Sequence, residues 1–123
     1  MAFLTDRKRV TGLGAAHTGT AHHWSMTVSS YGLLVLIPLF LLSVGPVIGA
    51  DYLTVVAHFG HPYPAIITAL TLIVSLTHFK NGVRVLIEDY VHGMMREILI
   101  IATVCFSYAA IAVGLFAIAR MAL

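Results

Sequence analysis

The sequence has few charged residues: Asp, Glu, Lys and Arg make up 10% of its 123 residues, against about 25% in a typical soluble domain. Apolar residues make up 59%, and the mean hydropathy is +0.95. This composition excludes an ordinary soluble enzyme. A chain of this length cannot hold both a large catalytic domain and membrane helices. We therefore expect a single membrane domain over residues 1–123 that is one subunit of a larger assembly.

Cysteine and clustered positive charge are also scarce. Cys105 is the only cysteine, which excludes a disulfide, a CxxC redox pair and a cysteine metal cluster within the chain. The seven Lys and Arg residues form no basic patch, so nucleic acid is not an expected partner. Residues 1–23 lack the early apolar core of a signal peptide, and their basic run is too short for a mitochondrial transit peptide. We expect a bacterial inner-membrane protein.

Two long uncharged runs and an apolar pattern between them predict three transmembrane helices. No charged residue occurs in residues 24–50 or 98–119, and about 20 apolar residues suffice to cross a bilayer. Between these runs an apolar pattern covers residues 65–90, which would form one helix about 39 Å long. We predict an all-α membrane protein with helices at about 24–49, 65–90 and 97–120. The dipeptide Gly45-Pro46 is a point where the first helix can kink or end early.

The distribution of basic residues predicts the orientation. Arg7, Lys8 and Arg9 precede the first helix, whereas residues 51–63, which we interpret as a loop, contain no Lys or Arg. Basic residues also flank the connection between the second and third helices: Lys80, Arg84 and Arg96. By the positive-inside rule, the N-terminus and this connection are cytoplasmic, and the loop at 51–63 and the C-terminus are external.

One face of the middle helix carries the candidate chemistry. His78, Gly82, Val85 and Asp89 fall within about 40° of one another at 100° per residue. An imidazole in the membrane is what a haem axial ligand requires, and Gly82 would leave room for a flat ligand beside it. The same histidine could instead bond to another helix or relay protons. Asp89 and Tyr90 fit equally well a solvated helix end and an aromatic belt.

The string His78-x3-Gly82-x6-Asp89-Tyr90 resembles the signature of the hydrophobic membrane anchor subunits of succinate dehydrogenase, the smaller of the two anchor chains of complex II. Chain length, helix count and the opening His22-His23-Trp24 before the first helix extend the resemblance. The resemblance implies that His78 is an axial ligand of haem b. It also implies that Asp89 and Tyr90 border the ubiquinone site.

The resemblance further implies partners: a second membrane anchor (cytochrome b) subunit, an iron-sulfur subunit and a flavoprotein subunit. Electrons from succinate would pass through the last two to ubiquinone, and this chain would have no activity alone. It would form part of a larger helical bundle with the companion anchor subunit. None of the other histidines considered matches the depth of His78: His22, His23, His58, His61 and His92. We therefore expect the second haem ligand to come from the companion.

One departure from the family pattern concerns an arginine early in the first helix. Here that stretch reads Met-Thr-Val-Ser-Ser over residues 26–30, and no Lys or Arg occurs between Arg9 and Lys80. The charge comes either from another subunit or from this chain. Our candidates for supporting the haem propionates or the quinone pocket are Lys80, Arg84, Ser29 and Ser30.

Three other functions compete with this hypothesis. The chain could be an anchor or assembly subunit without a cofactor, in which His78 only packs. It could belong to a fumarate reductase, with the opposite direction of electron flow. It could also be a small proton-coupled transporter with His78, Arg84 and Asp89 as the relay. Transporters of this size usually need internal or oligomeric symmetry, and the sequence shows no repeat.

Overall fold

The computed structural model describes residues 5–7, 10 and 19–123, and Lys8 and Arg9 of the basic run lie outside these ranges. Residues 19–123 form four α-helices and one 3₁₀ turn, without strands. Three segments are long and apolar enough to cross a membrane: Thr20–Val47, Pro62–Tyr90 and Met94–Ala122. The predicted all-α class with three spans is confirmed. The elements are α2 (Gly19–Val44), η1 (Gly45–Val47), α3 (Tyr52–Phe59), α4 (Pro62–Tyr90) and α5 (Met94–Ala122).

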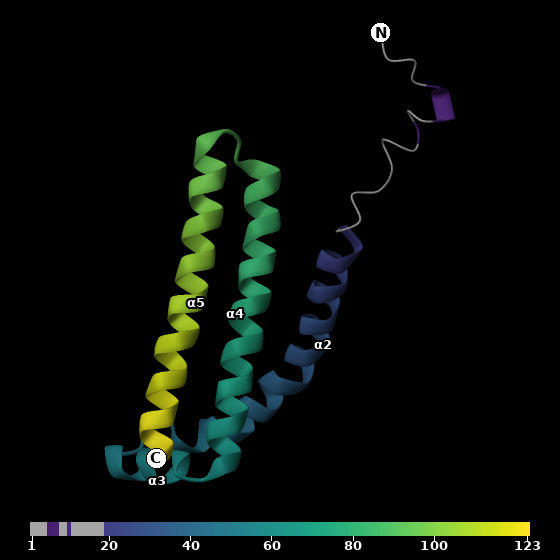
Figure 1. Ribbon diagram of the computed structural model, residues 1–123. Helices are drawn as coiled ribbons and strands as arrows, with labels where there is room; N and C mark the ends of the chain where they lie inside the picture. Colours follow the sequence, from purple (N-terminus) through teal and green to yellow (C-terminus); the bar gives the residue numbers. More distant parts are fainter. Residues whose placement is uncertain (1–4, 8–9, 11–18) are drawn as a thin grey trace.

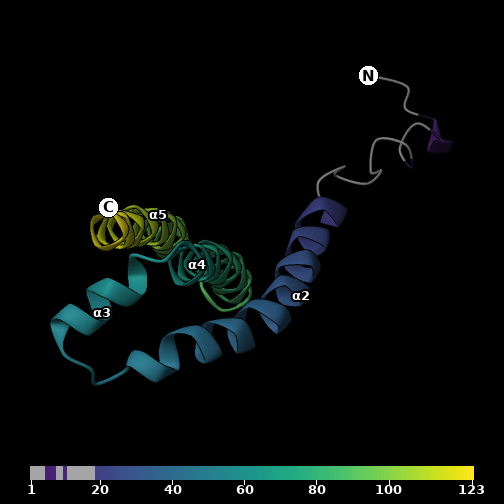
Figure 2. The same ribbon diagram turned by 90° about the horizontal axis from the view of Figure 1, so that it is seen from below.

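The middle span, α4, organises the molecule. It packs beside α5 along most of its length, and α2 crosses its other side at an angle (Figures 1 and 2). Within the described chain α2 and α5 share no contact. The start of α2 lies toward the end of the molecule that carries the α4–α5 connection, whereas α3 and the C-terminus lie at the other end. This grouping agrees with the predicted one; which end faces the cytoplasm stays a prediction.

The first membrane helix differs from its prediction at both ends. It begins at Gly19, five residues before the predicted start at residue 24, and α2 ends at Val44. Pro46 has no N–H for the helical ladder, and its ring crowds the preceding turn. The chain therefore tightens into η1 and leaves it in an extended conformation at Ile48. The early end at Gly45-Pro46 is thus confirmed.

The segment predicted as a loop at residues 51–63 contains a short helix, so that prediction was wrong. Asp51 caps α3, because its carboxylate accepts hydrogen bonds from Thr54 N at 3.3 Å and from Thr54 Oγ1 at 2.5 Å. Phe59 at the end of α3 is only 6% exposed. The helix lies across the ends of α4 and α5 (Figure 2). Its polar cap and buried aromatic residue suit the membrane interface.

The two remaining spans are slightly longer than predicted. α4 begins at Pro62 rather than residue 65 and ends at Tyr90 as expected, and α5 covers Met94–Ala122 rather than 97–120. Gly93 lies between them with φ of 68°, a conformation that other residues rarely adopt. Farther along α5, Gly114 faces Leu72 of α4 so closely that an added Cβ would overlap that side chain. This glycine lets the two helices approach each other.

Few side chains are buried within the described chain, and polar side chains are among them. Buried residues include Ser43, Thr71 and Ser107, whereas large apolar side chains such as Leu42 and Phe116 are exposed. The Thr71 hydroxyl donates to Ile67 O at 2.7 Å, and the Ser107 hydroxyl donates to Thr103 O at 2.8 Å. Hydroxyl groups satisfied by their own helix allow close packing in lipid. The outward apolar faces are left for lipid and for other subunits.

Candidate functional site

The crossing of α2 and α4 brings the predicted haem ligand against a serine of the first span. His78 is half-buried on α4, and its Nδ1 lies 2.8 Å from Oγ of Ser29 on α2. The Ser29 hydroxyl also lies 2.9 Å from Met26 O. The other ring nitrogen of His78, Nε2, has no hydrogen-bond partner among the described residues. The imidazole is therefore held on one side and free on the other.

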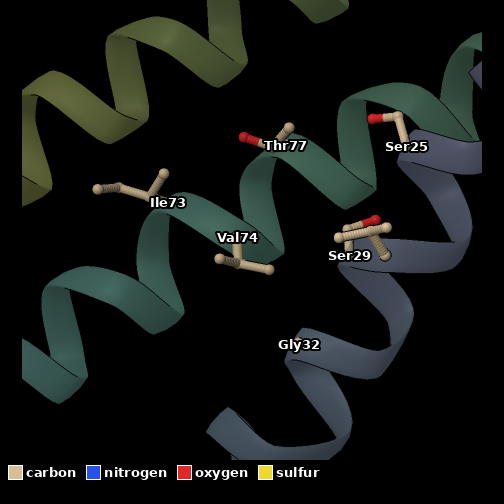
Figure 3. A pocket seen from close by; sticks show the side chains of 7 residues that line it. Ser25, Ser29, Gly32, Ile73, Val74 and Thr77 are labelled. Carbon is tan, nitrogen blue, oxygen red and sulfur yellow. The ribbon is translucent and has the colours of Figure 1, made fainter. Parts of the chain in front are cut away.

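Small and polar residues line the α2–α4 crossing on either side of this contact. Asn81 Nδ2 donates to Ser25 Oγ at 3.4 Å, and a Cβ on Gly32 would lie 3.5 Å from Val74 Cγ1. Positions 25, 29 and 32 share one face of α2 because steps of three and four residues return to the same side of a helix. Figure 3 shows this face opposite α4, where it lines a groove of about 370 Å³.

His78 also borders a second groove, on the surface of the α2–α4 pair. Its volume is about 430 Å³. It is lined by Ser30, Leu33, Leu34, Ile37, Pro38 and His78. Apart from the serine and the imidazole, this lining is apolar, and the groove is open toward the surroundings of the chain. A flat apolar ligand placed there would be covered only on one side by this chain.

Gly82 lies one turn from His78 and faces Met26 of α2. A Cβ added at Gly82 would lie 3.7 Å from Met26 Cε, which is ordinary van der Waals contact. Alanine would fit here, and glycine within a helix is about 1 kcal/mol less favourable than alanine. Packing between α2 and α4 therefore does not require a glycine at this position. A glycine here is consistent with the expected role of Gly82, which is to leave room beside His78.

The donor set fits a haem better than a bare metal ion. Among the described residues no three His, Cys, Asp or Glu side chains gather as a metal centre. A haem iron, already bound by four porphyrin nitrogens, takes only axial donors from the protein. One imidazole with a free nitrogen on an apolar groove meets that requirement from one side. No second histidine lines the same groove in the described chain.

The α4–α5 end of the molecule carries charged residues. Arg84 Nε lies 2.9 Å from Glu88 Oε1, and Arg96 Nη2 lies 3.8 Å from the same oxygen. Asp89 is exposed, and Tyr90 is 79% exposed at the last position of α4. Glu88 was not among the residues predicted from the sequence, although its four-residue spacing from Arg84 is typical of an ion pair on a helix. Asp89 and Tyr90 follow Glu88 at the end of α4, and neither of them lines the two grooves described above.

Lys80 lies apart from His78. Its Nζ is 3.3 Å from the Tyr108 hydroxyl and 5.0 Å from the centre of the Tyr108 ring, so it faces α5. Of the support candidates, the structure brings Ser29 and Ser30 to the His78 region. It places Arg84 with Glu88 and Lys80 with Tyr108.

The other histidines within the described residues lie toward the two ends of the molecule, and His17 lies outside those residues. His58 is in α3 and His61 precedes α4, at the end opposite the α4–α5 connection. His92 lies two residues after the end of α4, and His22 and His23 lie in the first turns of α2. These positions agree with the expectation that none of them reaches the depth of His78.

Comparison with known proteins gives consistent matches. Residues 3–117 match the family model described as succinate dehydrogenase/fumarate reductase transmembrane subunit. The succinate dehydrogenase hydrophobic membrane anchor subunit of Paracoccus denitrificans is 49% identical over 123 residues, covering 100% of this chain and 95% of the relative. No solved structure matches the chain.

Proposed function

Because the chain belongs to the family of succinate dehydrogenase and fumarate reductase transmembrane subunits, and is a membrane anchor subunit of succinate dehydrogenase, we propose that it binds haem b and forms part of the ubiquinone site. His78 would provide one axial ligand from α4. Asp89 and Tyr90, at the end of the same helix, would border the quinone. A companion anchor subunit would provide the second axial ligand.

The observation that carries the haem proposal is the environment of His78. The residue lies in a membrane-spanning helix, one ring nitrogen is hydrogen-bonded to Ser29, and the ring borders an apolar groove. A polar side chain at this depth is costly in lipid and therefore indicates a function or a partner. When bound, haem b supplies a one-electron carrier whose potential depends on its axial ligands and its surroundings. Ser30 and Gly82 would border it.

Tyr90 is the residue that we propose for quinone binding. Its phenol can donate a hydrogen bond to a quinone carbonyl oxygen and polarise that carbonyl as electrons arrive. Asp89, the preceding residue, would orient the tyrosine or a neighbouring cation, or relay protons from the cytoplasm. Tyr90 is 12 residues after His78, about 18 Å along the helix axis. Haem and quinone would therefore occupy different depths of the same bundle.

The open geometry of both sites supports the proposal of partner subunits. The His78 groove is covered by this chain on one side only, and Tyr90 is largely exposed. We propose that a cytochrome b anchor subunit completes the haem site. An iron-sulfur subunit would deliver electrons that a flavoprotein subunit takes from succinate. The assembly would lie in the bacterial inner membrane.

The test is a reduced-minus-oxidised optical spectrum of the purified complex together with its succinate-to-quinone activity. We expect His78→Ala to remove the b-type band and His61→Ala, a histidine at the far end of α4, to retain it. We expect Tyr90→Phe to keep the band and to lower quinone reduction by on the order of tenfold, the value of one hydrogen bond to the reacting carbonyl. Tyr63→Phe, at the opposite end of the same helix, is the matched control.

For each of the two proposed sites, one experimental result would contradict the proposal. A b-type band that survives His78→Ala would show that His78 is not a ligand and would favour an anchor without a cofactor in this chain. Equal quinone reduction by the Tyr90→Phe and Tyr63→Phe complexes would remove Tyr90 from the quinone site.

A further inference from the structure

Ser29 has two hydrogen-bonding neighbours but only one proton to donate. Its Oγ lies 2.9 Å from Met26 O and 2.8 Å from His78 Nδ1. A carbonyl oxygen can only accept, whereas a neutral imidazole nitrogen donates when protonated and accepts when not. Both bonds can form at once only when Ser29 donates to Met26 O and Nδ1–H of His78 donates to Ser29. The contacts therefore define the direction of each bond.

This direction decides which nitrogen of His78 is free to bind a metal. A neutral imidazole carries one proton, so a proton on Nδ1 leaves the lone pair on Nε2. Nε2 has no partner among the described residues, and His78 borders the open apolar groove. We propose that Ser29 is a positioning residue that holds His78 in the Nδ1-protonated form, with Nε2 presented to the haem iron. This inference rests on the proposed haem ligation by His78.

Of the two adjacent serines, Ser29 and Ser30, only Ser29 is proposed as a positioning residue. The Ser30 hydroxyl also donates to Met26 O, at 2.9 Å, but forms no hydrogen bond with His78, although both residues border the same groove. Ser29 and His78 lie on different spans, so their bond also fixes the rotation of the imidazole relative to α2. The second nitrogen of a metal-bound histidine usually donates to a carboxylate, a carbonyl or water, and this contact sets both orientation and basicity. Here a serine hydroxyl takes that position.

Removing the Ser29 hydroxyl, which accepts the hydrogen bond from His78 Nδ1–H, should change the haem potential and haem retention in predictable directions. An imidazole whose Nδ1–H is hydrogen-bonded is the stronger electron donor and stabilises the oxidised iron. Ser29→Ala should therefore raise the haem midpoint potential. It should also weaken haem retention by about tenfold to a hundredfold, the usual effect of losing such a supporting contact. Ser29→Thr keeps a hydroxyl at the same position and should restore both properties.

The experiment uses the intact complex with four variants of this chain: Ser29→Ala, Ser29→Thr, Ser25→Ala and His78→Ala. Ser25→Ala is the matched control, because it removes a hydroxyl one turn away that bonds Asn81 across the same helix crossing. Three readouts are independent of turnover: haem per complex, the potential from a redox titration of the b-type band, and the electron paramagnetic resonance g values of the oxidised haem. The g values report the orientation of the imidazole plane.

We expect Ser29→Ala to shift the potential and the g values, while Ser29→Thr and Ser25→Ala remain like the wild type. If Ser29→Ala matches the wild type in all three readouts while His78→Ala loses the band, Ser29 has no positioning role and the haem proposal stands. If Ser25→Ala produces the same shifts as Ser29→Ala, general loosening of the crossing explains them and the inference fails. Retention of the band in His78→Ala would overturn the proposed function itself.

Discussion

Replacing a glycine with alanine should have different effects at the two glycines that lie at helix contacts, Gly114 and Gly82. An added Cβ at Gly114 would overlap Leu72, whereas one at Gly82 would reach only ordinary contact with Met26. We predict that Gly114→Ala destabilises the chain by about 1–3 kcal/mol through overpacking between α4 and α5. Gly82→Ala should leave the fold equally or more stable, because alanine is the better helix former. Unfolding of the complex in detergent, followed by circular dichroism, measures both.

The haem content of the complex is a second property in which the Gly82 and Gly114 variants should differ. If Gly82 provides room for the porphyrin edge, Gly82→Ala should lower haem per complex although the protein remains folded. A second substitution, Leu72→Ala, should partly relieve the overpacking in Gly114→Ala, because it removes the side chain that the new methyl group meets. Equal stability losses for the two single glycine variants would contradict this interpretation of the helix contacts.

At the residue scale, the sequence predicted which residues share a face but not which residues meet across faces. Helical periodicity alone placed His78, Gly82 and Asp89 on one side of a helix. The contact between His78 and Ser29 depends on the crossing point and register of α2 against α4. The contact between Lys80 and Tyr108 likewise depends on the register of α5. Apolar periodicity specifies neither register, because many pairings bury similar small residues.

The short helix α3 has a cap that should make its stability depend on pH. The hydrogen bond from the Thr54 side chain, with one from the Thr54 backbone, holds the pKa of Asp51 below its usual value of 3.8. A carboxyl group whose pKa is lowered by folding stabilises the folded state above its unfolded pKa. That contribution is lost as the pH falls through the lowered value. We predict that α3 amides are protected from hydrogen exchange at neutral pH and lose protection in strong acid.

Two variants isolate this effect in hydrogen-exchange mass spectrometry. Asp51→Asn keeps a good capping side chain without a titrating group, so its α3 protection should not show the acid-dependent loss. Thr54→Val removes the hydroxyl donor and should return the pKa of Asp51 toward its usual value, which moves the loss of protection to higher pH. An identical pH response of the wild type and Asp51→Asn would show that Asp51 does not control the helix.

The elements that the sequence predicted well are those specified by long-range composition. Uncharged runs placed the two outer spans, an apolar pattern placed the middle span, and the end of α4 at Tyr90 agreed with its prediction. α3 was missed because its signal is local: an Asp followed three residues later by Thr, in a segment too short and apolar to separate from a loop. Helix starts moved by three to five residues because the first turn tolerates prolines and polar residues that the apolar pattern does not count.

On the scale of the whole molecule, α4 is the only span packed on two sides within the described chain. α2 and α5 each contact α4 and turn their remaining faces outward, with exposed residues such as Leu42 and Val113. Lipid can cover these faces at no hydrophobic cost, so the chain does not need partners for solubility in the membrane. The open His78 groove is different, because an imidazole facing lipid is unfavourable. The groove is therefore the place where a companion subunit is most needed.

The orientation of this assembly can be tested with cysteines on its two ends. In a Cys105→Ser background, which removes the exposed native thiol, Leu53→Cys places a thiol on α3 and Met94→Cys places one at the start of α5. If positive charge sets the topology, α3 is external. A membrane-impermeant maleimide should then label Leu53→Cys in intact spheroplasts, and should label Met94→Cys only in inverted vesicles. The Cys105→Ser parent should stay unlabelled. Labelling of Leu53→Cys only from the cytoplasmic side would reverse the orientation, and would place Asp89 and Tyr90 on the side away from cytoplasmic electron donors.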